Sequence, residues 1–385
     1  MDEAFWRDRP VLVTGCTGFL GPWLTKLLVR SGAKVVGLVR DGVADSSFRL
    51  SGLDACIDVV RGSVEDYPTI ERAINEYEVD VVFHLAAQAI AGTAMRSPLS
   101  TFTTNVLGTA HVLEAVRTTG CARRVVIASS DKAYGNQDDL PYTEDHPLRG
   151  RYPYDVSKTC TDLIAGSYWH SYFKSAQRPV ALAVARCANL FGGGDFNWSR
   201  VVPRQVRNVI RGDDLLYNRC VRHFLYVVDA AEAYLLLAER LDADGVAGEA
   251  FNFGADDGAL SMEELVAGAI AETARRRGHG EARTRQLLYP PDYPARPARA
   301  VSPGEAIEGY LEHPPGEIVA QYLSCEKARR RLGWAPLHSL RDGLEDAFAW
   351  YEAWFAGRDM AKVTDGMLDR RPAREARPAR WHAAA

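Results

Sequence analysis

A glycine-rich turn near the start of the chain restricts the possible fold more than any other feature of the sequence. Val11-Leu12-Val13 predicts a buried strand, and glycines follow at positions 15, 18 and 21, where an amphipathic helix begins. Glycine allows a tight turn and a close approach of the backbone to a pyrophosphate, and the helix N-terminus supplies free N–H groups. Because this motif lies between a strand and a helix, it predicts a dinucleotide-binding site.

The first half of the chain alternates short apolar runs with helical patterns. Strands joined by helices form a parallel sheet that is covered on both faces. The sequence therefore predicts an α/β fold with a Rossmann-type, doubly wound parallel sheet. The expected strands are 11–13, 35–39, 57–60, 79–85, 124–128 and 180–185, and the expected helices are 23–31, 69–77, 100–117 and 154–173.

The alternation weakens after Phe191, where three consecutive glycines interrupt it. We predict a nucleotide-binding domain over residues 1–191 and a smaller α/β substrate domain over 192–355, not strictly contiguous. The stretch 275–303 is rich in Arg, Pro and Gly and predicts a loop insertion. Residues 356–385 are expected to form a flexible tail, because the chain ends in Arg, Pro and Ala without apolar periodicity.

Composition excludes several classes of protein. The net charge of −4 gives no general attraction to nucleic acid or to a membrane surface. The seven cysteines are scattered without a Cys-x-x-Cys pair, so neither a disulfide framework nor a metal site is expected. The sequence shows no signal-peptide core and no run of about 20 apolar residues. We therefore expect a soluble, cytoplasmic protein.

Tyr154 and Lys158 lie four residues apart at the predicted start of a helix and so share one helix face. A cation beside a phenol favours the phenolate and lowers its pKa. Such a tyrosine can take the proton of a hydroxyl group while hydride leaves the same carbon. The pair is common by chance, but here it follows a dinucleotide motif and a serine-rich strand end, which favours a catalytic role.

Polar and small residues follow two predicted strands at the edge of the sheet where ligands bind. One strand ends in Ala128-Ser129-Ser130-Asp131-Lys132, and we expect the chemistry there. The other ends in His84-Leu85-Ala86-Ala87-Gln88, whose small alanines would let a cofactor pass closely.

These motifs occur in a fixed order along the chain, together with Asn105-Val106-x-Gly108-Thr109. They resemble the extended short-chain dehydrogenase/reductases of the nucleotide-sugar epimerase/dehydratase family, over roughly residues 9–354. Ser130-Asp131-Lys132-x-Tyr134 and Gly192-Gly193-Gly194-Asp195 look most like CDP-glucose 4,6-dehydratases, whereas Gly37-Leu38-Val39-Arg40 is similar to GDP-mannose 4,6-dehydratases. The resemblance implies a nucleotide-diphosphate sugar as substrate and a homodimer.

The resemblance also implies roles for individual residues. Ser130 would hydrogen-bond the sugar 4-hydroxyl, Asp131 would donate the proton for loss of water, and Asn189 and Arg222 would contact the nucleotide diphosphate. The predicted catalytic residues are Ser130, Asp131, Lys132, Tyr154 and Lys158, and the predicted substrate contacts are Gln88, Ser130, Asn189 and Arg222. The predicted cofactor contacts are Gly15, Thr17, Gly18, Phe19, Leu20, Arg40, Ser63, Val64, Leu85, Ala86, Ala87, Gln88, Asn105, Ser129, Tyr154 and Lys158.

The end of the second strand bears on the choice between NAD and NADP. An acidic residue there holds the ribose 2′-hydroxyl of NAD. Val39 stands at that position and Arg40 follows, and because an arginine suits a 2′-phosphate, NADP is favoured. The alternative is that Arg40 is only a solvated strand end and that Asp41 reaches the ribose.

The expected reaction is a 4,6-dehydration. Transient oxidation at C4 acidifies the C5 proton, water leaves from C6, and a 4-keto-6-deoxy sugar results. Related dehydratases often carry a glutamate after the aspartate, but this chain has Lys132, which is either the C5 base or an ion-pair partner of Asp131. The alternatives are a 4-epimerase, which does not need Asp131, and a decarboxylase or another lyase that begins with oxidation.

The sequence departs from the family pattern in three places. Ser63 replaces an aspartate that often touches adenine, His223 replaces the aspartate after Arg222, and Pro314-Pro315-Gly316 stands where Arg-Pro-Gly is usual. The last two departures leave the nucleotide and the sugar open.

Overall fold

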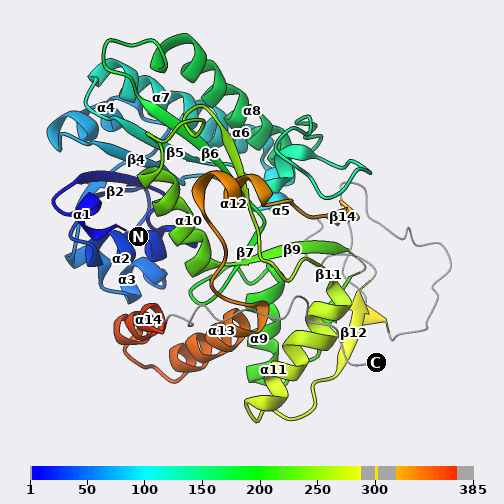
Figure 1. Ribbon diagram of the computed structural model, residues 1–385. Helices are drawn as coiled ribbons and strands as arrows, with labels where there is room; N and C mark the ends of the chain where they lie inside the picture. Colours follow the sequence, from blue (N-terminus) through cyan, green and yellow to red (C-terminus); the bar gives the residue numbers. More distant parts are fainter. Residues whose placement is uncertain (1, 219, 288–299, 302–317, 371–385) are drawn as a thin grey trace.

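The computed structural model describes residues 2–218, 220–287, 300–301 and 318–370 (Figure 1). Seven strands, all parallel, form the central sheet in the order β10-β6-β5-β4-β1-β2-β3. The predicted Rossmann-type, doubly wound parallel sheet is confirmed. The strands are β1 (Pro10–Thr14), β2 (Lys34–Val39), β3 (Asp58–Arg61), β4 (Val81–His84), β5 (Arg124–Ala128), β6 (Ala181–Cys187) and β10 (Ala250–Phe253).

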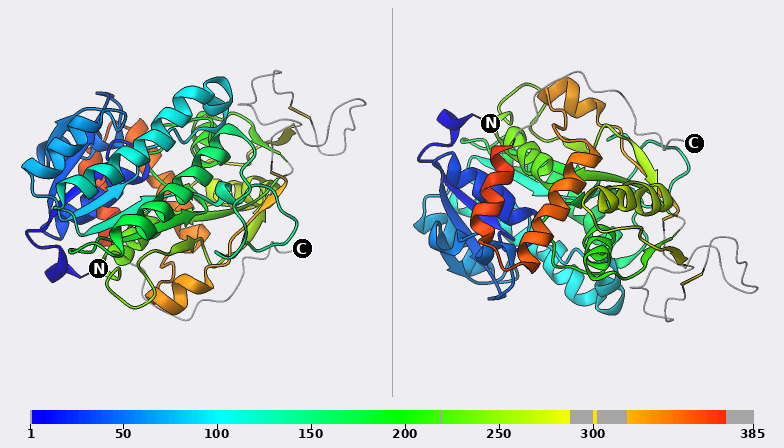
Figure 2. Two further views of the ribbon diagram at one scale, coloured as in Figure 1. Left: turned by 90° about the horizontal axis from the view of Figure 1, so that it is seen from above. Right: turned by 90° about the horizontal axis from the view of Figure 1, so that it is seen from below.

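The two faces of this sheet bury alternate residues in separate apolar cores, as a strand with a period of two requires. In β1, Val11 and Val13 belong to one core and Leu12 to the other, and all three are almost fully buried. Figures 1 and 2 show one group of helices on each face. The first face carries α2 (Leu20–Arg30) and α10 (Val227–Glu239), and the second carries α4 (Tyr67–Glu76), α7 (Gly108–Thr119) and α8 (Pro153–Tyr168).

The two long helices expected from the sequence are present, each with a π-helical turn. The first runs through α6 (Pro98–Phe102), the π turn η2 (Thr103–Leu107) and α7, and α8 continues into the π turn η4 (Trp169–Phe173). Such turns insert a residue and are frequent at functional sites. Shorter elements in this half are α1 (Glu3–Trp6), α3 (Ser47–Leu50), η1 (Leu53–Ala55), α5 (Ala91–Arg96) and η3 (Asp131–Tyr134).

The second half builds two small sheets against the carboxyl ends of the main strands. One contains β7 (Asn189–Phe191), β9 (Val221–Tyr226), β11 (Ala259–Ser261) and β14 (Ala320–Gln321), and the other contains β8 (Leu215–Tyr217), β12 (Thr284–Leu287) and β13 (Ala300–Val301). Because β10 and α10 belong to the main sheet and its cover, the second half is shared between both units. The remaining helical elements are α9 (Val201–Arg211), η5 (Glu264–Ile270), α11 (Ala271–Arg276), α12 (Glu326–Leu332) and α13 (Leu340–Phe355).

The loop insertion expected at 275–303 is only partly a loop. It contains the end of α11, and β12 pairs in parallel with β8 and antiparallel with β13. Residues 288–299 and 302–303 lie outside the described residues.

The flexible tail expected at 356–385 is wrong for its first part, because α14 (Met360–Asp369) packs there. Met360, Met367 and Leu368 are buried in the main core, and Lys26 Nζ of α2 lies 3.1 Å from Asp365 Oδ2. Figure 2 shows α14 beside α13. The helix was not predicted because the Arg- and Pro-rich composition of the chain end outweighed the apolar spacing of residues 360–368. Residues 371–385 lie outside the described residues.

Within the described ranges, none of the helices combines the length and the apolar character needed to cross a bilayer. The same ranges contain no group of three or more His, Cys, Asp or Glu side chains placed to hold a metal ion.

Candidate active site

The glycine turn packs directly against the backbone that follows β4. Gly15 has a φ of +75°, and a Cβ on it would lie only 2.7 Å from the backbone nitrogen of Ala86. A Cβ on Gly21 would lie 2.2 Å from the carbonyl oxygen of Gly15. Since no side chain fits at these positions, the turn stays tight and directs the N-terminus of α2 toward the strand ends, as a pyrophosphate requires.

A buried chain of hydrogen bonds fixes β4 beside this turn. Thr14 Oγ1 lies 2.8 Å from His84 Nδ1, and His84 Nε2 lies 3.1 Å from Thr109 Oγ1. Burial, together with the charge of Lys158, lowers the pKa of His84 to about 3. His84 is therefore neutral at physiological pH and supports the turn.

A cavity of about 540 Å³ runs from the glycine turn along the carboxyl ends of β4, β5 and β6 to β9. Its place at the end of a parallel sheet is where ligands of such folds bind. The predicted residues that line it are Gly15, Gly18, Phe19, Leu20, Leu85, Ala87, Ser129, Ser130, Asp131, Lys132, Tyr154, Lys158, Asn189 and Arg222.

The other predicted contacts do not line this cavity, namely Thr17, Arg40, Ser63, Val64, Ala86, Gln88 and Asn105. Asn105 supports its wall instead: its side chain accepts from Gln88 N at 2.7 Å and donates to Ser157 Oγ at 2.9 Å. Arg40 follows β2 on the surface, where Nε lies 2.7 Å from Asp41 Oδ2.

Tyr154 and Lys158 both face the cavity from the first turns of α8, but their charges differ from the expectation. Burial raises the pKa of Tyr154 to about 12, although a hydrogen bond with Ser130 lowers it in part. Lys158 Nζ donates to the carbonyl oxygen of Ala128 at 2.7 Å, and burial lowers the pKa of its ammonium to about 8. The lowered phenol pKa predicted from the pair is thus not found in the protein alone, because loss of solvent outweighs the Ser130 hydrogen bond and the positive charge of Arg200.

Ser130, Asp131 and Lys132 lie side by side where β5 leads into η3. Ser130 Oγ accepts from Lys132 N at 3.2 Å and donates to Asp131 Oδ1 at 2.9 Å. Lys132 Nζ lies 3.2 and 3.1 Å from the two carboxylate oxygens of Asp131, whose side chain is only 2% exposed. Burial lowers the pKa of Lys132, while the Asp131 carboxylate opposes this shift.

Ser129 is hydrogen-bonded to a buried ion pair formed by Asp162 and Arg186. Its Oγ donates to Asp162 of α8, and Arg186 Nε lies 2.8 Å from the other oxygen of that carboxylate. Arg186 also donates to the hydroxyl of Tyr134 at 2.8 Å. This network ties β5, β6, η3 and α8 together beneath the predicted catalytic residues.

The far wall of the cavity comes from β7 and β9. Arg222 faces the cavity, and its Nη1 donates to the carbonyl oxygens of Val221 at 2.9 Å and Val319 at 3.3 Å. Asn189 Nδ2 donates to His223 O at 3.0 Å. The His223 side chain is buried outside the cavity lining, where Nε2 lies 2.7 Å from Ala255 O and Nδ1 accepts from Leu323 N.

The departure at His223 therefore concerns packing between β9, β14 and the segment after β10. The Pro314-Pro315-Gly316 departure lies outside the described residues.

Three polar residues of this region were missed by the sequence analysis. Asp155 faces the cavity, and burial raises the pKa of its carboxyl to about 6. Arg200 faces it too and is held by Asp195, with Nη1 2.9 Å from Oδ2. Asp155 could have been found, since it follows Tyr154 in the motif. Arg200 and the buried Gln321 carry no sequence signal, because only the fold brings their segments to this place.

The glycine turn, the parallel sheet and the Tyr154–Lys158 pair at one cavity define an NAD(P)-dependent short-chain dehydrogenase/reductase of the extended type. The chain belongs to the family described as GDP-mannose 4,6 dehydratase, which matches residues 12–347. The resemblance inferred from the motifs is thereby confirmed.

Individual relatives agree with this assignment. A CDP-glucose 4,6-dehydratase of Salmonella typhimurium is 31% identical, over 94% of this chain and 95% of the relative. Among solved structures, a dTDP-glucose 4,6-dehydratase of Streptomyces venezuelae with NAD bound has a TM-score of 0.71 at 24% identity, covering 91% of this chain and 99% of that one. A UDP-glucose 4-epimerase of Thermotoga maritima has a TM-score of 0.72 at 23% identity, covering 90% and 99%. These two structures bear on the fold alone.

Proposed function

We propose that this protein is a nucleotide-sugar 4,6-dehydratase and that CDP-glucose is its substrate. The observation that carries the proposal is the Asp131–Lys132 pair, which lies beside Ser130 and Tyr154 at the same cavity. An epimerase has no use for a buried acid at this position, since it removes no water. The relative that is 31% identical over nearly the whole chain is a CDP-glucose 4,6-dehydratase, which supports this choice of nucleotide and sugar.

The cavity fits a dinucleotide cofactor. The glycine turn leaves no room for side chains beside Ala86, and the N-terminus of α2 opens onto the cavity from Gly18 to Leu20. Gly15, Gly18 and Leu20 would hold the pyrophosphate, and Lys158 would bind the nicotinamide ribose. When bound, the nicotinamide supplies a reversible acceptor for the hydride that leaves C4 and returns at C6.

Each step of this reaction needs a residue that takes or gives a proton. Tyr154 takes the proton of the 4-hydroxyl, with Ser130 hydrogen-bonded to it, and Lys158 stabilises the phenolate that does so. The resulting ketone acidifies C5–H. Neutral Lys132 takes that proton, while Asp131 gives its own proton to the 6-hydroxyl, which leaves as water. When hydride returns at C6, Lys132 gives the proton back to C5.

The buried ion pair can supply the forms that this step requires. Transfer of a proton from Lys132 to Asp131 turns two buried charges into two neutral groups, which burial favours. A single proton transfer thus creates both the acid and the base. Under this interpretation Lys132 is a catalytic residue, and its ion pair with Asp131 is the form that the two side chains adopt before the reaction.

A panel of nucleotide sugars tests the proposal. The purified protein is incubated with CDP-glucose, GDP-mannose, dTDP-glucose and UDP-glucose, and the products are analysed by mass. We expect one member, CDP-glucose, to lose 18 mass units, the mass of water. An isomer of unchanged mass would contradict a dehydratase and favour the 4-epimerase. Turnover of another sugar nucleotide alone would contradict only the choice of substrate.

We further propose NADP as the preferred cofactor, on the basis of Arg40 at the end of β2. Its ion pair with Asp41 is exposed on both sides, 62% and 61%, so it costs little to exchange for a phosphate. Replacement of Arg40 by alanine should weaken NADP binding about tenfold and leave NAD binding within twofold, since a charge-assisted hydrogen bond contributes about 1.5–3 kcal/mol. Fluorescence titration of both cofactors measures this.

Lys34→Ala, at the opposite end of the same strand, is the matched control for charge. Tighter binding of NAD than of NADP by the natural protein would contradict the proposal and favour contact of Asp41 with the ribose.

The homodimer implied by the resemblance stays a proposal. It is supported by large apolar side chains that α6, η2 and α8 leave exposed, among them Leu99, Leu107 and Leu163. Sedimentation velocity would show twice the monomer mass, and a monomer at micromolar concentration would contradict it.

A further inference from the structure

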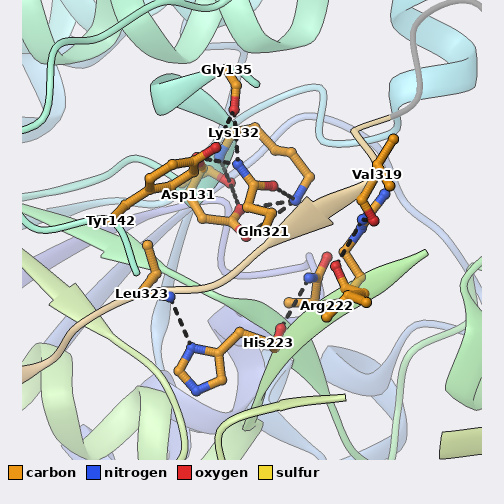
Figure 3. A network of polar contacts seen from close by, with 12 residues as sticks. Asp131, Lys132, Gly135, Tyr142, Arg222, His223, Val319, Gln321 and Leu323 are labelled. Atoms are coloured by element: carbon orange, nitrogen blue, oxygen red, sulfur yellow. Dashed lines mark hydrogen bonds and ion pairs between the residues drawn. The ribbon is translucent and has the colours of Figure 1, made fainter. Parts of the chain in front are cut away.

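Gln321 is a fully buried amide in contact with the Asp131–Lys132 pair (Figure 3). It lies on β14, which pairs in parallel with β9 and sets Gln321 directly opposite Arg222. No motif marks this residue, and the chain separates it from Lys132 by 189 positions. A buried polar side chain costs free energy unless its hydrogen bonds are satisfied, so the partners of the Gln321 amide decide whether it can be accommodated here.

The hydrogen bonds fix the orientation of the amide. Gln321 Nε2 donates to the carbonyl oxygen of Asp131 at 2.7 Å and lies 3.5 Å from that of Gly135. A carbonyl oxygen only accepts, so the amide nitrogen must be on this side. Oε1 then faces Lys132, whose Nζ donates to it.

Lys132 is consequently held between two acceptors. The Asp131 carboxylate binds its amine from one direction and Gln321 Oε1 from another. A lysine side chain has a flexible four-carbon stem, and a displacement of about 1 Å from a working geometry can cost about 10²-fold in rate. The second contact removes the freedom that the carboxylate alone would leave.

We propose that Gln321 is a positioning residue that holds the Lys132 amine and the Asp131 backbone in the geometry for C5 deprotonation and loss of water. This inference rests on the proposed 4,6-dehydratase function. Gln321 does not line the cavity, so it acts through Lys132 and Asp131. Tyr154 and Lys158 lie on α8 and do not depend on it, so oxidation at C4 should survive its loss.

Two substitutions test the role in opposite directions. Gln321→Leu removes the acceptor and the donor at similar volume, and Gln321→Glu keeps an acceptor but adds a charge. Other charged groups that act on Lys132 are Asp131 of η3, Asp155 of α8 and Arg222 of β9. These stay in both variants, so a difference between the variants reports on position 321.

The first measurement is the pH dependence of kcat. The active Asp131–Lys132 pair carries one proton, so the alkaline limb of the profile reports the loss of that proton. An acceptor of a hydrogen bond stabilises the ammonium form, so its removal lowers the pKa of Lys132. We expect the alkaline limb to move about one unit lower in Gln321→Leu and to move higher in Gln321→Glu. The kcat of Gln321→Leu should fall about 10- to 100-fold, while KM changes less than threefold.

The second measurement is exchange of C5 hydrogen in D₂O, followed by mass analysis of recovered sugar. It should fall with kcat in Gln321→Leu. Ser324→Ala, three residues along the same segment, is the control that should keep the natural rate and pH profile. Thermal unfolding confirms that all variants are folded.

The outcomes separate this inference from the proposed function. Unchanged pH limbs and C5 exchange in both variants, beside normal dehydration by the natural protein, overturn the role of Gln321 alone. A loss of kcat with unmoved limbs also overturns it, since a merely structural effect would produce that result. Failure of the natural protein to dehydrate any sugar of the panel overturns both.

Discussion

Replacement of Tyr154 by phenylalanine is expected to reduce kcat for dehydration by about 10²–10⁴-fold, the range that a positioned acid–base group contributes. The substitution removes one oxygen atom, and with it the hydrogen bond to Ser130 and the group that takes the 4-hydroxyl proton. KM for the nucleotide sugar should change less than threefold, because Asn189 and Arg222 on the far wall are untouched. Mass detection of the 4-keto product measures the effect.

This variant should also lose the C5 exchange that oxidation at C4 makes possible. Tyr168→Phe is the matched control: it removes a hydroxyl from the same helix, where Tyr168 donates to Glu114 outside the cavity. Activity of Tyr154→Phe within tenfold of the natural protein would exclude Tyr154 as the base.

Replacement of Asp131 by asparagine should separate oxidation from loss of water. Asparagine keeps the shape and still accepts from Lys132, but it has no proton to give to the leaving 6-hydroxyl. We expect kcat for dehydration to fall about 10²–10⁴-fold. C5 exchange should persist, because removal of the carboxylate lets burial lower the pKa of Lys132 further and favours the neutral amine.

The measurement is again the mass of the sugar recovered from D₂O. A gain of one mass unit without product is the expected result, and it distinguishes this variant from Gln321→Leu, which should lose exchange as well. Asp138→Asn, on the exposed loop after η3, controls for the change in charge. Full dehydration by Asp131→Asn would show that another group is the acid, with Asp155, which lines the same cavity, as the next candidate.

The parts of the site that could be predicted from the sequence are those whose chemistry is local. Gly15 is required by its positive φ and Gly21 by a contact within the same turn, and the Tyr154–Lys158 spacing is a property of one helix. The strand β5 was predicted with its bounds, because its apolar run is continuous and a polar run ends it. Helix α14 was missed, since its apolar residues matter only where they meet α2 and α13.

By itself, the sequence determined the class of fold, the glycine turn and the residues that we propose for the acid–base chemistry, because turns, helix faces and strand ends follow from neighbours along the chain. The tertiary structure decided what surrounds them. Burial raises the pKa of Tyr154 and lowers that of Lys132, and only the folded chain excludes water from these groups. It also brings Gln321 of β14 to Lys132. These residues are 189 positions apart, and no sequence motif predicts their contact.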